Sequence, residues 1–136
     1  MARPPIAPFP DDAFSRVLCA VAHPDDVEYG MSSAVAAWTS KGIEVAYLLL
    51  TRGEAGIDTL DPKATAELRV REQIKGSHEV GVTRVQFLEY PDGVLEYSLS
   101  MRRDIARAIR SFRPDALVVS SWEVEFAIGL NQADHR

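Results

Sequence analysis

A histidine and two carboxylates lie within four residues near the start of the chain, in the stretch His23-Pro24-Asp25-Asp26. The adjacent carboxylates repel one another, and removing both from water would raise their pKa values, a cost that a divalent cation reverses. Zinc binds imidazole nitrogen and carboxylate oxygen, and in catalytic sites it lowers the pKa of its water to about 7. We therefore expect His23, Asp26 and, from a neighbouring loop, His135 to bind one ion. Asp25 points elsewhere on the turn and is free to act as the base on the bound water.

Each of these short motifs also has a purely structural interpretation. His-Pro-Asp-Asp alone is compatible with an ordinary turn, because Pro and Asp favour turns. Cys19 lies in an expected strand, where a small buried residue is the simpler interpretation, and His78 lies inside an expected helix. Only the combination of His23, its carboxylates and His135 at one rim of a sheet favours a metal site.

The segments that must position these residues alternate between two hydrophobic periodicities. Short apolar or alternating stretches predict strands at residues 16–22, 44–51, 84–90 and 116–120. Between them, three segments have helical spacing: a stripe of Met31, Ala34, Val35 and Trp38, the segment 64–80, and a stripe of Met101, Ile105, Ala108 and Phe112. Gly42 suits the end of the first helix, and Pro114 helps to end the third.

This order predicts an α/β fold: a Rossmann-like open, mostly parallel sheet with helices on both faces. Continuous apolar runs in the first, second and fourth strands indicate burial on both sides. Sites in such sheets form beyond the carboxyl ends of the strands. Four loops should meet there, at residues 22–28, 51–56, 90–93 and 131–136.

Length and composition restrict the class of protein further. The chain has 136 residues, a net charge of −5 and one cysteine. The negative charge argues against nucleic-acid binding, no apolar run approaches the roughly 18 residues of a membrane span, and the single cysteine makes a cytoplasmic location the default. We expect an irregular N-terminal lead-in over residues 1–15 and one domain, or part of one, over residues 16–136.

The stretch Ala22 to Glu28 resembles the AHPDD(x)E signature of the PIG-L/LmbE-type zinc-dependent de-N-acetylases. Further motifs of that family follow in the same order: TRGEAG at 51–56, ELRVRE at 67–72, PDG at 91–93, RPDALVV at 113–119 and ADHR at 133–136. The resemblance covers almost the whole chain from Val17 onward.

The resemblance implies a role for each matching residue. His23, Asp26 and His135 would bind zinc, and Asp25 would be the general base. Arg69 and Asp92 would hold sugar hydroxyls or the acyl group, and Asp134 would orient a neighbouring side chain. Glu28 would fix its loop or cap the following helix, whereas Glu54 and Glu72 would support the site or the fold.

Two features depart from the family pattern. Gln132 stands where the family has a histidine that polarises the acyl oxygen or protonates the leaving amine; an amide can donate a hydrogen bond to an oxyanion but cannot deliver a proton. In addition, family members continue past the ADHR motif with strands and helices that wall the substrate pocket. The resemblance therefore implies that these residues are the N-terminal part of a single deacetylase domain, with little activity expected from them alone.

These observations predict a zinc-dependent hydrolase that removes an N-acetyl or other N-acyl group from an amino sugar or its glycoconjugate, a small-molecule substrate. The sequence leaves the acceptor and the oligomeric state open, including a homo-oligomer. Two alternatives stand beside this hypothesis. A metal-dependent phosphoesterase would use magnesium or manganese and more carboxylate ligands. A non-catalytic Rossmann-like binding module is the other, although the absence of GxGxxG after the first strand argues against dinucleotide binding.

Overall fold

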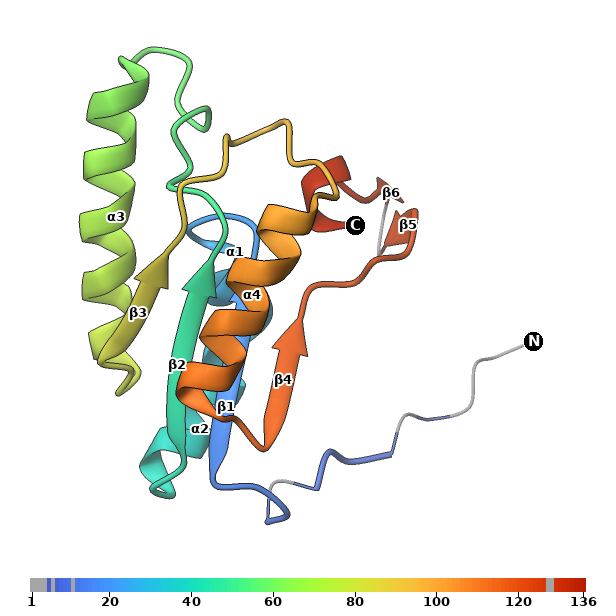
Figure 1. Ribbon diagram of the computed structural model, residues 1–136. Coiled ribbons are helices and arrows are strands. Elements are labelled where there is room, and N and C mark those ends of the chain that lie inside the picture. The colour runs from blue at the N-terminus through green and yellow to red at the C-terminus, as the bar shows by residue number, and fades with distance from the viewer. Residues whose placement is uncertain (1–4, 6, 11, 127–128) are drawn as a thin grey trace.

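A computed structural model describes residues 5, 7–10, 12–126 and 129–136. Its centre is a four-stranded parallel sheet with the order β3-β2-β1-β4 (Figure 1). The strands are β1 (Arg16–Val21), β2 (Glu44–Leu49), β3 (Arg84–Phe87) and β4 (Ala116–Val119). The predicted parallel α/β fold is confirmed.

The helices lie on both faces of this sheet, as predicted. α1 (Asp26–Gly30) and α2 (Ser32–Ser40) lie behind the sheet in Figure 1, and α4 (Leu99–Phe112) crosses its front. Behind the sheet, Val35 and Trp38 join a core with the odd-numbered residues of β1; in front, Ala108 and Phe112 pack on Leu18, Ala46 and Leu48. α3 (Pro62–Glu79) runs beside β3.

Local sequence signals explain where the longer helices begin. The Asp61 side chain accepts hydrogen bonds from the backbone amides of Lys63 and Ala64, and Pro62 occupies the first turn of α3. The Ser98 side chain accepts from the amide of Met101 at the start of α4. Both are N-caps, which satisfy amides that have no partner inside the helix.

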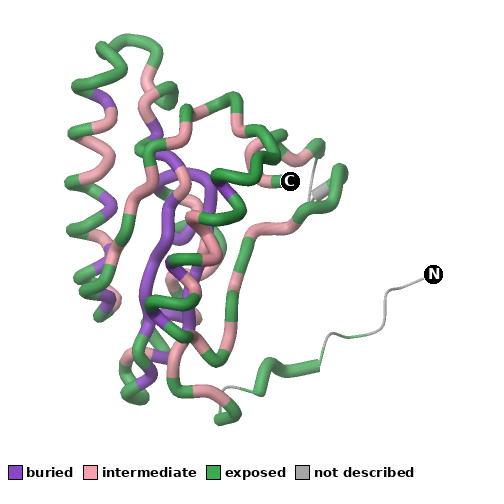
Figure 2. Tube along the Cα trace, in the orientation of Figure 1, coloured by how far each residue is buried: buried purple, intermediate pink, exposed green. Residues whose placement is uncertain are grey.

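Burial of the strands matches the expectation for β1 and β2 but not for β4 (Figure 2). The expectation that the fourth strand is buried on both faces is wrong, because Leu117 and Val119 are 47% and 46% exposed. β4 is an edge strand, and α4 lies over β1 and β2 rather than over these two side chains. The two residues line an apolar groove of about 880 Å³ beside α4.

The structure also contains short elements that the sequence patterns do not predict. These are α1 and two short strands, β5 (Glu125–Phe126) and β6 (Gly129–Leu130), which form a separate antiparallel pair. Part of the expected lead-in, residues 1–4, 6 and 11, lies outside the described residues; in the rest, Phe9 and Phe14 pack against Trp38. None of the helices described has the length and apolarity needed to cross a membrane.

Candidate metal centre

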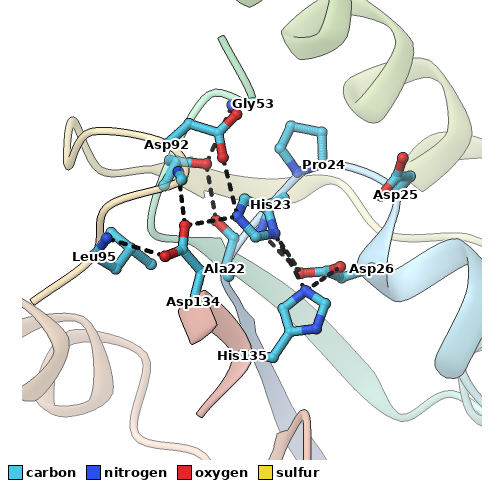
Figure 3. Close-up of polar contacts among 12 residues, drawn as sticks. Ala22, His23, Pro24, Asp25, Asp26, Gly53, Asp92, Leu95, Asp134 and His135 are labelled. Carbon is cyan, nitrogen blue, oxygen red and sulfur yellow. Dashed lines mark hydrogen bonds and ion pairs between the residues drawn. The ribbon is translucent and has the colours of Figure 1, made fainter. Parts of the chain in front are cut away.

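Two histidines and three aspartates meet beyond the carboxyl ends of the parallel strands (Figure 3). His23 comes from the turn after β1, Asp26 from the first residue of α1, Asp92 from the loop after β3, and Asp134 and His135 from the short 3₁₀ helix η1 (Ala133–His135). His23 is only 8% exposed, and the carboxylates around it are nearly buried as well. The predicted convergence of His23 with His135 is confirmed.

Three of these side chains present ligand atoms to one point. The Asp26 carboxylate lies 3.6 Å from His23 Nδ1 and 3.1 Å from His135 Nε2, and the two ring nitrogens are 3.3 Å apart. All three ligand atoms lie within 4.8 Å of one another. Two imidazoles and one carboxylate form a donor set suited to zinc.

The partners of the other ring nitrogens orient both imidazoles. His23 Nε2 lies 3.0 Å from Asp92 and 3.1 Å from Asp134, so it is the nitrogen that donates. His135 Nδ1 lies 3.3 Å from Asn131 Oδ1, while the amide nitrogen of Asn131 donates to the backbone carbonyls of Ser121 and Glu123. When the rings are neutral, the proton of each lies on the nitrogen that faces these partners. His23 Nδ1 and His135 Nε2, which face Asp26, therefore carry the lone pairs.

The charges of this cluster are unbalanced without a cation. Three carboxylates face two imidazoles, so the cluster keeps a net negative charge even when both rings are protonated. Burial favours a lower pKa for His23, but the Asp26 and Asp134 carboxylates outweigh it and raise that pKa to about 9. Burial favours higher pKa values for Asp26 and Asp134, yet hydrogen bonds from His23 and from backbone amides hold both below their usual range. A divalent cation would replace the proton on His23 and offset the excess charge.

Neighbouring loops hold the aspartates in place through backbone amides. Asp134 accepts from the amides of Gly93 and Leu95 at 2.7 and 3.0 Å. The Asp92 carboxylate accepts from the amide of Ala55, and its own amide donates to Glu54. The supporting role expected of Glu54 agrees with this contact.

Asp25 lies beside the cluster and takes a different partner. Its backbone is left-handed, with φ 82°, and its carboxylate pairs with Arg69 at 2.9 Å. Burial raises the pKa of Asp25 despite the opposing charge of Arg69. Asp25 and Arg69 line the same cavity as the cluster, about 500 Å³ in volume, together with His23, Asp26, Ala55, Gly56, Asp92, Gly93, Gln132, Ala133, Asp134 and His135.

Arg69, expected to contact substrate, is tied to the protein itself. Besides Asp25, its guanidinium donates to the carbonyls of Pro24 at 2.7 Å and Gly53 at 3.1 Å. Gly53 has φ +69°, and a Cβ there would lie 2.6 Å from the guanidinium. Gly56 leaves room for the same group. The glycines of the 51–56 loop thus admit Arg69, whose contact with substrate stays a prediction.

The remaining predicted residue, Gln132, is exposed and precedes η1, where its carbonyl accepts from the amide of His135. Two residues with clear structural roles were not anticipated from the sequence: Asn131, which orients His135, and Gln73, which contacts Asp25. A signal for Gln73 exists, because Thr65, Arg69, Gln73 and Ser77 recur every four residues as a polar stripe on α3. Three members of this stripe, Thr65, Gln73 and Ser77, are buried.

The fold and the site together define a Rossmann-like α/β protein with a His/Asp group able to hold a metal ion at the rim of its sheet. Residues 18–136 match the PIG-L family model, described as GlcNAc-PI de-N-acetylase. The chain belongs to this family.

Several known proteins are similar to the chain. Diacetylchitobiose deacetylase of Thermococcus kodakarensis is 36% identical over 116 residues, covering 82% of this chain and 42% of the relative. A probable N-acetyl-alpha-D-glucosaminyl L-malate deacetylase 2 of Bacillus anthracis is 30% identical over 113 residues, covering 78% and 50%. The solved structure of N,N'-diacetylchitobiose deacetylase from Pyrococcus horikoshii, complexed with its inhibitor MPG, superposes with a TM-score of 0.85 at 29% identity, covering 93% of this chain and 47% of that one. The chain therefore spans half or less of the length of these relatives.

Proposed function

We propose that the protein is a zinc-dependent hydrolase that removes an N-acetyl group from an amino sugar or a conjugate of one. The observation that carries this proposal is the convergence of His23 Nδ1, the Asp26 carboxylate and His135 Nε2 on one point. The carboxylate of Asp25 lies in the same cavity but is not one of these ligand groups. Membership of the PIG-L family and the names of the similar deacetylases support the reaction class.

The residues at the site fit a zinc ion. His23, Asp26 and His135 would hold it, because their lone pairs face one point and because the buried carboxylates leave negative charge to offset. When bound, zinc polarises an amide carbonyl and makes water acidic enough to attack near neutral pH. Asp92 and Asp134 hold His23 from its other ring nitrogen, which keeps Nδ1 free for the ion.

Asp25 is proposed as the general base. It lies in the cavity but outside the group of ligands, and Arg69 holds its carboxylate. The ionised carboxylate takes a proton from the attacking water as the new carbon–oxygen bond forms at the acyl carbon. The same group then returns a proton to the nitrogen as the carbon–nitrogen bond breaks, which releases the amine and acetate. This return step meets the need for an acid where Gln132 cannot supply a proton.

Gln132 and Asp134 are proposed to support the reaction in different ways. Gln132 lines the cavity, and its amide can donate a hydrogen bond to the oxyanion. Asp134 acts by orienting His23. Asp92 and Arg69 are proposed to border the sugar-binding region, and a cytoplasmic location remains our prediction.

The test is release of amine from N-acetylglucosamine and N,N'-diacetylchitobiose by the zinc-loaded full-length protein, with metal content measured after purification. Asp25→Asn should lower kcat by about 10²- to 10⁴-fold while zinc stays bound. Asp58→Asn makes the same chemical change at an exposed position and should have no effect. Unchanged amine release by Asp25→Asn would show that the base is wrong. Failure to retain zinc, with weak binding of magnesium instead, would favour the phosphoesterase.

A further inference from the structure

Gln73 is a buried amide at the middle of α3, only 3% exposed. Its Oε1 accepts from the backbone amide of Asp25 at 2.9 Å, 48 residues away in the sequence. Its Nε2 donates to Glu28 Oε1 at 2.7 Å and also lies 3.3 Å from Ser77 Oγ. The side chain therefore joins α3 to both sides of the turn that follows β1.

The turn needs such a restraint because Asp25 has an unfavourable backbone conformation. Its φ of 82° and ψ of −20° are left-handed, a region in which most residues with a Cβ are strained and which aspartate visits only occasionally. Arg113 and Asp25 are the only residues other than glycine with positive φ in the described part of the chain. Strained residues of this kind persist when their surroundings hold them.

Glu28 fixes which way the Gln73 amide faces. A carboxylate can only accept, so Nε2 must face Glu28 and Oε1 must face the Asp25 amide. Gly76 provides the room for this contact, since a Cβ at that position would lie 3.2 Å from Glu28 Oε1. The contact of Glu28 with α3 agrees with its expected role in fixing the loop.

We propose that Gln73 is a positioning residue for the deacetylation reaction, because it holds Asp25 in the left-handed conformation that places its carboxylate in the cavity against Arg69. The inference rests on the proposed function for its catalytic consequence. Arg69 holds the same peptide unit through the Pro24 carbonyl. Without the acceptor on Gln73, the peptide loses one of these two restraints and relaxes part of the way toward an ordinary conformation. The carboxylate, still paired with Arg69, then shifts from its position beside the metal ligands.

Two measurements on the full-length protein test this role. Gln73→Met keeps the length of the side chain and removes both polar groups. Backbone amide exchange at Asp25, followed by NMR, should become roughly ten-fold faster or more, the effect of losing a hydrogen bond worth about 1.4 kcal/mol. For amine release from diacetylchitobiose, kcat should fall by up to about a hundred-fold with little change in KM, because misplacement of the base affects the chemical step.

Two further variants separate positioning from folding. Thr65→Val changes another buried position of α3, whose hydroxyl has no hydrogen-bond partner among the described residues, and should leave both measurements unchanged. Gln73→Glu alone would place two carboxylates together. In the double variant Glu28→Gln/Gln73→Glu, the new amide at position 28 donates to the new carboxylate at position 73, which can still accept from the Asp25 amide. This variant should recover slow exchange and most of kcat.

The outcomes are distinguishable. Wild-type exchange at Asp25 in Gln73→Met, equal acceleration in Thr65→Val, or fast exchange with an unchanged kcat would each overturn the positioning role. If the full-length wild-type protein releases no amine from either sugar, the proposed function fails, and the exchange rates alone decide whether Gln73 holds the turn.

Discussion

Replacing Asp134 with asparagine tests how the candidate metal centre is held together. Both oxygens of this carboxylate face donors: Oδ2 faces His23 Nε2 and the Gly93 amide, and Oδ1 faces the Leu95 amide. An asparagine NH₂ group in either orientation must point at one of these donors, and the negative charge is lost in both. His23 Nε2 then has weaker support, so Nδ1 is less firmly kept as the free ligand atom.

The expected result is a zinc affinity about 10- to 100-fold weaker, which corresponds to about 1.4–2.7 kcal/mol. A competition titration against a chromophoric chelator at one fixed pH measures it. Asp58→Asn removes the same charge from an exposed position and should bind zinc like the wild type. Wild-type affinity in Asp134→Asn would refute the idea that this carboxylate orients His23, whereas equal weakening in Asp58→Asn would point to a general effect of charge.

Three further predictions concern stability. Free zinc at 100 times its Kd should raise the free energy of unfolding by about 2.7 kcal/mol, and EDTA should reverse the accompanying rise in Tm. Left-handed strain alone costs an alanine about 1–2 kcal/mol. Gly53→Ala should lower the free energy of unfolding, measured in urea, by more than this, because its Cβ would also meet Arg69. Gly42→Ala is the control for strain alone, because Gly42 has a positive φ but open space around it. Asp115 accepts from the Ser15 amide and hydroxyl and from the Arg16 amide, which hold its pKa below the usual range. The ionised Asp115 therefore contributes fully to the stability of the fold above its unfolded pKa of about 3.9, and this contribution is lost as pH falls through the lower folded pKa. The difference in free energy of unfolding between wild type and Asp115→Asn should shrink below about pH 4.

The strand and helix periodicities predicted most of the fold because each pattern reports a local property. The apolar residues at 45–49 and the stripe from Met101 to Phe112 lie where the patterns indicate. The error at β4 has a physical cause: Leu117 and Val119 have the composition of a buried strand, but composition does not say which element covers each face. The same limit applies to α1, since its first residues follow a left-handed Asp25 that only tertiary contacts maintain.

The site was predictable to the extent that topology controls it. Loops after parallel strands meet at one rim, so His23 and Asp26 on the first loop could be placed near His135 despite the separation in sequence. Which ring nitrogen each histidine presents could not be predicted. That choice depends on Asp92, Asp134 and Asn131, and on the carbonyls of Ser121 and Glu123 that anchor Asn131.

The polar stripe on α3 contains both a residue of a family motif, Arg69, and a positioning residue, Gln73, and the two act on Asp25 in different ways. Arg69 and Gln73 lie one helical turn apart and contact the same residue, one through its carboxylate and the other through its backbone amide. Losing Arg69 would remove the charge that opposes a rise in the pKa of Asp25, whereas losing Gln73 would release the backbone and leave that charge in place. Gln73 therefore acts on the position of the proposed base, whereas Arg69 acts on its acidity and, through the Pro24 carbonyl, also on its position. A single helix face can supply both because residues four apart lie on the same side of the helix.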